Sequence, residues 1–98
     1  MNELVKQAHD YAVDKGFWYD YGNDAKSLIV KLALISTEVS EAIEDVRTAN
    51  RTHLGEELAD IAIRLADFAG ALDIDLDDEI NKKMEKNLGR PYMHGKFA

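Results

Sequence analysis

Apolar residues recur every three or four positions along most of this chain, which is the spacing of one face of an α-helix. Four helices are predicted, from about Asn2 to Asp14, from a cap at Asn23 or Asp24 to Arg47, from His53 to Leu72 and from Leu76 to Leu88. Turn residues separate or end them, including Gly16 after the first helix and Gly89 and Pro91 after the last. The pattern predicts an all-α fold.

The two central helices should form an antiparallel hairpin, because the polar turn at 48–52 is short enough to force the chain back on itself. Each helix carries an apolar stripe that we expect to be buried. The stripe residues are Leu4, Val5, Ala8, Tyr11 and Ala12 in the first helix, Leu28, Leu32, Ile35, Val39, Ala42, Ile43 and Val46 in the second, and Leu54, Leu58, Ile61, Ile63, Leu65 and Phe68 in the third. Together the helices predict a four-helix bundle-like protomer.

The chain has 98 residues, which is enough for one domain with one small core. We expect that domain to span residues 1–98, with 89–98 as an extended C-terminal tail. Domains of this size are often stabilised by disulfides, by a metal ion or by self-association, and the sequence has no cysteine. We therefore expect a bound ion or a homo-oligomer.

Charge narrows the classes of function. The net charge of −7 repels nucleic acid polymers and anionic membranes, so neither is expected as a partner. No apolar run approaches the roughly 20 residues of a membrane-spanning helix, and no signal-peptide core is evident, so we expect a cytoplasmic protein. Residues 1–80 carry a net charge of −11 and residues 81–98 one of +4. One site could therefore hold a cation and a polyanion together, although basic residues at a helix end also compensate its dipole.

Four carboxylates have a matched register in the predicted hairpin. Glu38 and Glu41 are three residues apart on the second helix, and Glu57 and Asp60 are three apart on the third, so each pair shares a helix face. Folding about the turn places Glu41 level with Glu57 and Glu38 level with Asp60. Helices that pack about 8–10 Å apart allow these side chains to reach a shared ion.

Such a cluster favours a divalent cation, because four like charges repel strongly in a partly dry groove. Oxygen ligands select Mg²⁺, or Mn²⁺ as a substitute, over zinc. Two alternatives remain: the pairs are solvated helix faces, or Arg64 offsets their charge in a structural ion network.

The segment Thr37-Glu38-Val39-Ser40-Glu41, followed after 15 residues by Glu57-Leu58-Ala59-Asp60, resembles the E-E-x-x-E…E-x-x-D pattern of MazG-like all-α nucleoside triphosphate pyrophosphatases. The segment from Lys83 to Lys96 resembles the K-M-x-x-N-x-x-R-P-x-x-H-G-K ending of small members of that family. Thr37 stands where the pattern has its first Glu, which leaves open whether one or two metal ions bind.

The resemblance implies Mg²⁺-dependent hydrolysis of nucleoside triphosphates to monophosphates and pyrophosphate, as house-cleaning of the nucleotide pool. It makes Glu38, Glu41, Glu57 and Asp60 the metal-binding and catalytic residues, with Glu38 or Glu41 as a possible general base. It also implies a homodimer or homotetramer. Lys83, Asn87 and Arg90 recur at helical spacing and, with Lys96, are expected to bind the substrate phosphates.

Base recognition is assigned to the aromatic segment 17–21. Trp18, with Tyr19, is expected to stack on the nucleobase, the alternative being that this cluster belongs to the core. Cysteine-based metal motifs, a phosphate-cradling glycine loop and a serine triad are all missing from the sequence. Two other functions remain open: a non-catalytic helical regulatory module with an acidic groove, and an inactive relative that only binds nucleotides.

Overall fold

The computed structural model describes residues 1–90, in which four helices follow one another: α1 (Asn2–Asp14), α2 (Ala25–Arg47), α3 (Leu54–Ala71) and α4 (Leu76–Leu88). All four lie within two residues of their predicted bounds, and this part of the chain contains no strand. The all-α prediction is therefore confirmed. Among the same residues, no helix combines the length and the apolar content that crossing a membrane requires.

Local interactions explain where the helices begin and end. The Asp24 side chain accepts a hydrogen bond from the Ser27 backbone N–H at 3.1 Å and caps α2. Asp75 caps α4 in the same way, accepting from the Asp78 N–H at 3.0 Å. Gly16 follows α1 with a φ of 79°, a left-handed conformation that glycine adopts without the steric cost of a side chain.

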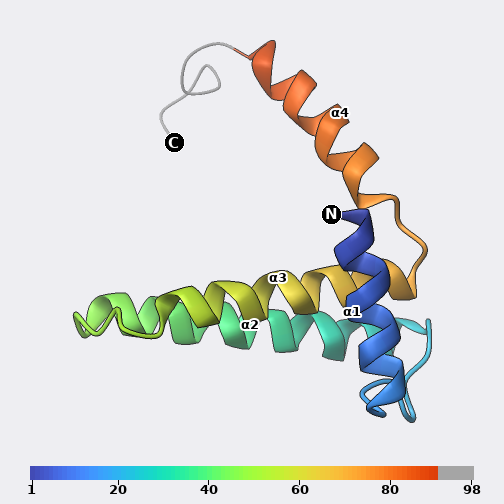
Figure 1. Cartoon of the computed structure of the whole chain (residues 1–98), viewed down its shortest axis with the longest axis horizontal. Coiled ribbons are helices and arrows are strands. Elements are labelled where there is room, and N and C mark those ends of the chain that lie inside the picture. The colour runs from blue at the N-terminus through green and yellow to red at the C-terminus, as the bar shows by residue number, and fades with distance from the viewer. Residues whose placement is uncertain (91–98) are drawn as a thin grey trace.

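The helices form an open arrangement rather than a closed bundle (Figure 1). α2 and α3 run side by side as a long antiparallel hairpin, and α1 crosses the end of the hairpin that lies away from the 48–53 turn. α4 leads away from the hairpin and contacts α1. Asn2 ties these two helices together, since its side-chain N–H donates to Asp75 at 2.8 Å and its side-chain oxygen accepts from the Asp77 backbone N–H at 3.0 Å.

The core lies where α1 crosses α3 and is built from small side chains. Its buried members are Val5, Ala8, Ala66 and Ala69. Gly70 allows the closest approach, because a Cβ atom added there would lie 2.6 Å from the Cβ of His9 and 3.2 Å from the Val5 carbonyl oxygen. Small residues on both helices thus bring α1 close to α3.

The prediction that every apolar stripe is buried is wrong for the single chain. The exposed members are Tyr11 in α1, Leu32, Val39, Ile43 and Val46 in α2, and Leu58, Ile63 and Leu65 in α3. Ile43 is 55% exposed and Leu58 is 57% exposed. The reason is architectural: α1 covers only one end of the hairpin, and α4 buries none of its own residues.

Replacing Gly70 with alanine should lower the free energy of unfolding by about 1–3 kcal/mol, because the added methyl group meets backbone and Cβ atoms that can yield only if α1 moves. Gly55→Ala is the matched control, since a Cβ there meets nothing within 4 Å and alanine favours the helix. Urea unfolding of both variants measures the difference. Equal stability of the two variants would show that α1 does not depend on this contact.

Candidate functional site

Glu57 is the centre of an acidic group between α2 and α3. Its side chain is partly buried, and its Oε2 atom is buried without a hydrogen-bond partner in the described part of the chain. Contact with the Asp45 carboxyl, burial, and the charges of Asp45, Glu41 and Glu38 together raise the pKa of Glu57 to about 7. The hairpin register therefore brings Glu38 and Glu41 close enough to Glu57 for their charges to act on it.

Sequence analysis missed Asp45, whose hydrogen bond with Glu57 is the largest cause of the raised pKa. Two carboxyl groups can share such a bond only if one of them holds a proton. The sequence held a usable clue, because Asp45 lies four residues after Glu41 and so on the same face of α2. The residue with the largest effect on the pKa of Glu57 is thus one turn nearer the hairpin turn than Glu41.

Glu38 lies beside a cation. The Arg64 Nε atom is 3.2 Å from Glu38 Oε1, and the Glu38 side chain is mostly shielded from solvent. The sequence suggested Arg64 as a cation that could offset the charge of the four carboxylates, and the structure pairs it with Glu38 across the hairpin. Arg64 therefore offsets the charge of one of the four carboxylates, as one of the two alternatives for this cluster required.

Asp60 stands apart from the other three carboxylates. It is exposed, and it is not among the charges that raise the pKa of Glu57. Within residues 1–90, no three histidine, aspartate or glutamate side chains are placed closely enough to hold one metal ion. Thr37 donates to the Ala33 carbonyl oxygen at 3.1 Å within its own helix, so its hydroxyl is directed to the backbone of α2.

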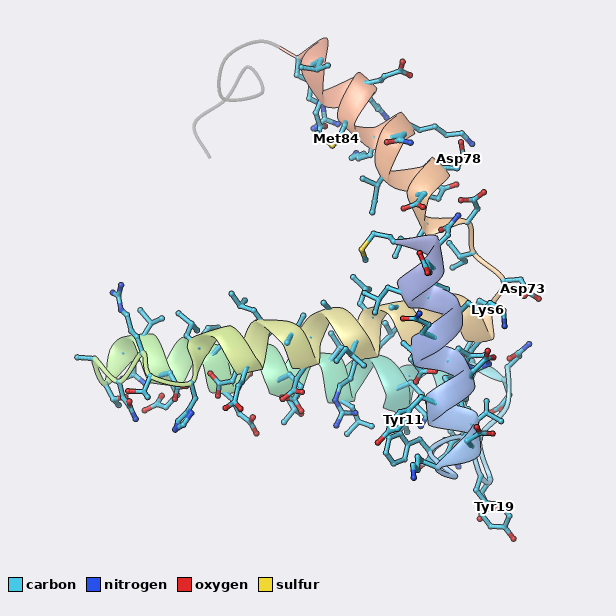
Figure 2. The ribbon with its side chains drawn as sticks, in the orientation of Figure 1. Lys6, Tyr11, Tyr19, Asp73, Asp78 and Met84 are labelled. Atoms are coloured by element: carbon cyan, nitrogen blue, oxygen red, sulfur yellow. The ribbon has the colours of Figure 1, made fainter. Side chains whose placement is uncertain are left out.

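A cavity of about 520 Å³ lies next to the carboxylates, between α1, the loop that follows it, and the hairpin. This volume is in the range of pockets that bind small molecules. Tyr11, Phe17 and Trp18 are among its aromatic lining residues, and Figure 2 shows Tyr11 on the side of α1 that faces the hairpin. Asp60 and Arg64 also line the cavity, and Arg64 connects it to the acidic group through its ion pair with Glu38.

Trp18 and Tyr19, the two predicted base-stacking residues, have different surroundings. Trp18 is partly buried and lines the cavity, and its indole N–H donates to both carboxylate oxygens of Asp67, at 2.8 and 3.0 Å. Tyr19 is 78% exposed and points away from the helices (Figure 2). Of these two predicted residues, Trp18 is the one that is placed to contact a ligand in the cavity.

Lys31 is a second residue that sequence analysis missed. Its ammonium group lies 4.6 Å from the ring centre of Trp18 and 4.5 Å from that of Tyr21, and it donates to the Phe17 carbonyl oxygen. Desolvation lowers the pKa of Lys31, and the nearby Asp67 charge partly opposes this effect. The clue was a lysine inside an otherwise apolar run of α2, from residue 28 to residue 35.

The predicted phosphate-binding residues of α4 lie away from the carboxylates. Lys83 and Asn87 are exposed on α4, which leads away from the hairpin (Figure 1), and Arg90 is exposed two residues after that helix ends. Within residues 1–90, their side chains form no ion pair with the acidic group. Lys96 and the rest of the predicted tail from residue 91 onward lie outside the described residues.

Comparison with known families places most of this site in one domain. The family model of the MazG nucleotide pyrophosphohydrolase domain matches residues 26–94. The match includes the hairpin carboxylates, Lys31 and α4, and it leaves out α1 and Trp18. No curated protein and no solved structure shows a significant match to the chain.

The raised pKa of Glu57 predicts that the metal-free protein loses stability as the pH rises from about 4.5 to 7. The folded state holds this proton more tightly than the unfolded chain does. The resulting stabilisation is complete below pH 4.5, the ordinary pKa of the group, and is lost as the pH passes 7. Urea unfolding at pH 5 and pH 8 should show a larger loss in the wild type than in Glu57→Gln.

Glu85→Gln is the control, because Glu85 is an exposed carboxylate of α4 that forms no ion pair within residues 1–90. Its pH dependence should follow that of the wild type. The same pH dependence in Glu57→Gln and in the wild type would contradict the assignment.

Proposed function

Because this chain belongs to the MazG nucleotide pyrophosphohydrolase family, we propose that it hydrolyses nucleoside triphosphates, or their deoxy forms, to monophosphates and pyrophosphate. The family supports a hydrolase that acts on nucleotides. The observation that carries the proposal in this chain is the crowding of Glu38, Glu41 and Asp45 around the partly buried Glu57. Such crowding is costly unless a proton or a cation relieves it.

Pyrophosphohydrolases of this family generally use divalent metal ions. The carboxylate oxygens around Glu57 are the type of ligand that such an ion prefers, and Glu57 has a buried oxygen without a partner. In the single chain, however, no three of these side chains within residues 1–90 lie closely enough to share one ion. We propose that Glu38, Glu41, Glu57 and Asp60, joined by Asp45, change their side-chain rotamers to converge on Mg²⁺, with Mn²⁺ as a substitute. When bound, the ion neutralises phosphate charge and lowers the pKa of the attacking water.

The side chains around the cavity provide binding and orientation. Arg64 contacts Glu38 and lines the cavity, so its guanidinium group is positioned to bridge a catalytic carboxylate and a phosphate oxygen. Lys31 adds a second positive charge to the cavity lining. In this proposal the nucleobase enters the aromatic part of the cavity beside Trp18, and the triphosphate extends toward Asp60 and the other carboxylates.

The exposed apolar surface of the hairpin supports self-association, as a homodimer or homotetramer. Leu32, Val39, Ile43 and Leu58 are each at least 40% exposed in the single chain, and exposed apolar side chains on neighbouring helices are typical of protein interfaces. Lys83, Asn87, Arg90 and Lys96 remain the proposed phosphate ligands. A second copy could bring its α4 to the carboxylates of the first.

We place the activity in the cytoplasm, where it would remove excess or unwanted nucleotides from the pool. The net charge of −7 and the lack of cysteine are compatible with that setting. Small phosphorylated substrates and a divalent ion are the partners that this site suits.

Glu41→Gln and Asp60→Asn should each lower the rate of Mg²⁺-dependent pyrophosphate release by about 100-fold or more, because each removes a charged ligand oxygen. Glu56→Gln, on the exposed side of α3, is the control and should retain the wild-type rate. Products are identified by mass after incubation with common and damaged nucleotides. Full activity of both variants would refute the proposal, and turnover of no nucleotide would favour the non-catalytic alternatives.

The wild-type protein should sediment as a dimer or a larger species at micromolar concentration. Ile43→Lys places a charge on the exposed apolar stripe of α2 and should shift the population toward the 11.0 kDa monomer. A matched charge at an exposed position of α1, Val13→Lys, should leave the sedimentation unchanged. A wild type that sediments only as a monomer would contradict self-association.

A further inference from the structure

Asp67 joins three segments that line the cavity. Its carboxylate accepts hydrogen bonds from the indole N–H of Trp18 at 2.8 and 3.0 Å and from the Nδ1–H of His9 at 2.8 Å. The Asp67 side chain is only 14% exposed, so these charge-assisted bonds are largely shielded from water. One side chain of α3 therefore fixes a ring from α1 and a ring from the loop that follows it.

Trp18 is restrained on more than one side. The Lys31 ammonium group lies over its ring, and the His9 ring packs against it edge-on, with 5.7 Å between ring centres and an angle of 76°. The indole cannot rotate without breaking its bonds to Asp67 or moving Lys31. A ligand ring that contacts Trp18 must therefore meet an indole of fixed orientation.

Asp67 also lies on the same face of α3 as the proposed catalytic residue Asp60. Asp60, Arg64 and Asp67 follow one another at intervals of four and three residues, so they lie on one face of α3, and all three line the cavity. Seven residues span about 10 Å along a helix. We call Tyr11, Phe17 and Trp18, which line one side of the cavity, its aromatic wall. The same face of α3 thus carries the proposed catalytic carboxylate of Asp60 at one end and Asp67, which binds Trp18 of the aromatic wall, at the other.

The aromatic wall is not part of the matched domain. The family model covers residues 26–94, whereas the wall residues Tyr11, Phe17 and Trp18 precede it, as does His9, which packs behind Trp18. Asp67 lies inside the match and connects this N-terminal segment to α3. Selectivity for the base is therefore expected to depend on residues that the family pattern does not define.

From these contacts we propose that Asp67 is a positioning residue for nucleobase selection. It sets the orientation of Trp18 and His9, and the orientation of Trp18 determines which planar base is bound. The proposal rests on the proposed hydrolysis of nucleoside triphosphates. It assigns no chemical step to Asp67.

The chain has a single tryptophan, so indole fluorescence reports Trp18 alone. In Asp67→Ala, acrylamide should quench the emission of Trp18 more strongly than in the wild type, because the indole loses its anchor. Asp10→Ala is the control, since Asp10 is an exposed carboxylate of α1 that pairs with Lys6 and does not line this cavity. Its quenching should match that of the wild type.

Kinetics separate positioning from a purely structural role. Asp67→Ala should raise the KM for the best substrate about tenfold and change kcat by less than twofold. The ratio of kcat/KM for the best base to kcat/KM for the second-best base should fall by about tenfold as well. In a Trp18→Phe background, which lacks the indole N–H, Asp67→Ala should add less than a twofold further change in KM. That non-additivity is the signature of action through Trp18.

Three results would overturn the proposal: quenching equal to that of the wild type, an unchanged ratio between bases, or an equal effect of Asp67→Ala in both backgrounds. If the wild type hydrolyses no nucleotide, the proposed function fails by itself. Titration with the four common nucleoside monophosphates, followed by Trp18 emission, then decides the role of Asp67. Base-dependent binding that is lost in Asp67→Ala supports the role, and the same binding in both proteins refutes it.

Discussion

Repulsion among carboxylates across the α2–α3 hairpin is the constraint on which the functional part of this structure depends. Glu57 is held where burial and three neighbouring acids all oppose its negative charge, and the result is a pKa of about 7. The hairpin maintains this arrangement because its short turn fixes the register between the helices. Because binding a proton or a cation relieves this repulsion, the site favours binding either one.

The position of α1 determines what can lie beside those carboxylates. Small residues at the crossing, Ala8 against Ala66 and Ala69, together with Gly70, let α1 approach α3 closely. The close approach holds the following loop against the hairpin, where Lys31 and Asp67 fix the ring of Trp18. The cavity therefore arises from packing outside the carboxylate group. If the proposed function holds, changes in the cavity would alter substrate choice without altering the carboxylates.

Sequence analysis was most successful where the determinants are local. Helix ends follow from caps such as Asp24 and Asp75, and the meeting of Glu38, Glu41 and Glu57 follows from helical spacing and a short turn. The sequence predicted less well the contacts between side chains of different helices. Neither the pairing of Arg64 with Glu38 nor the anchoring of Trp18 by Asp67 can be derived from spacing, since both depend on rotamers and on the angle at which α1 crosses.

Burial was the least predictable property, and the reason bears on function. The apolar stripe of α2 was expected to be buried, and in one chain Val39 and Ile43 stay exposed beside Glu38 and Glu41 in sequence. A second copy that covered this stripe would also exclude water near the carboxylates. A lower local dielectric strengthens both the repulsion among the acids and their attraction for a divalent ion. Self-association and ion binding would then reinforce each other, because each lowers the cost of the other.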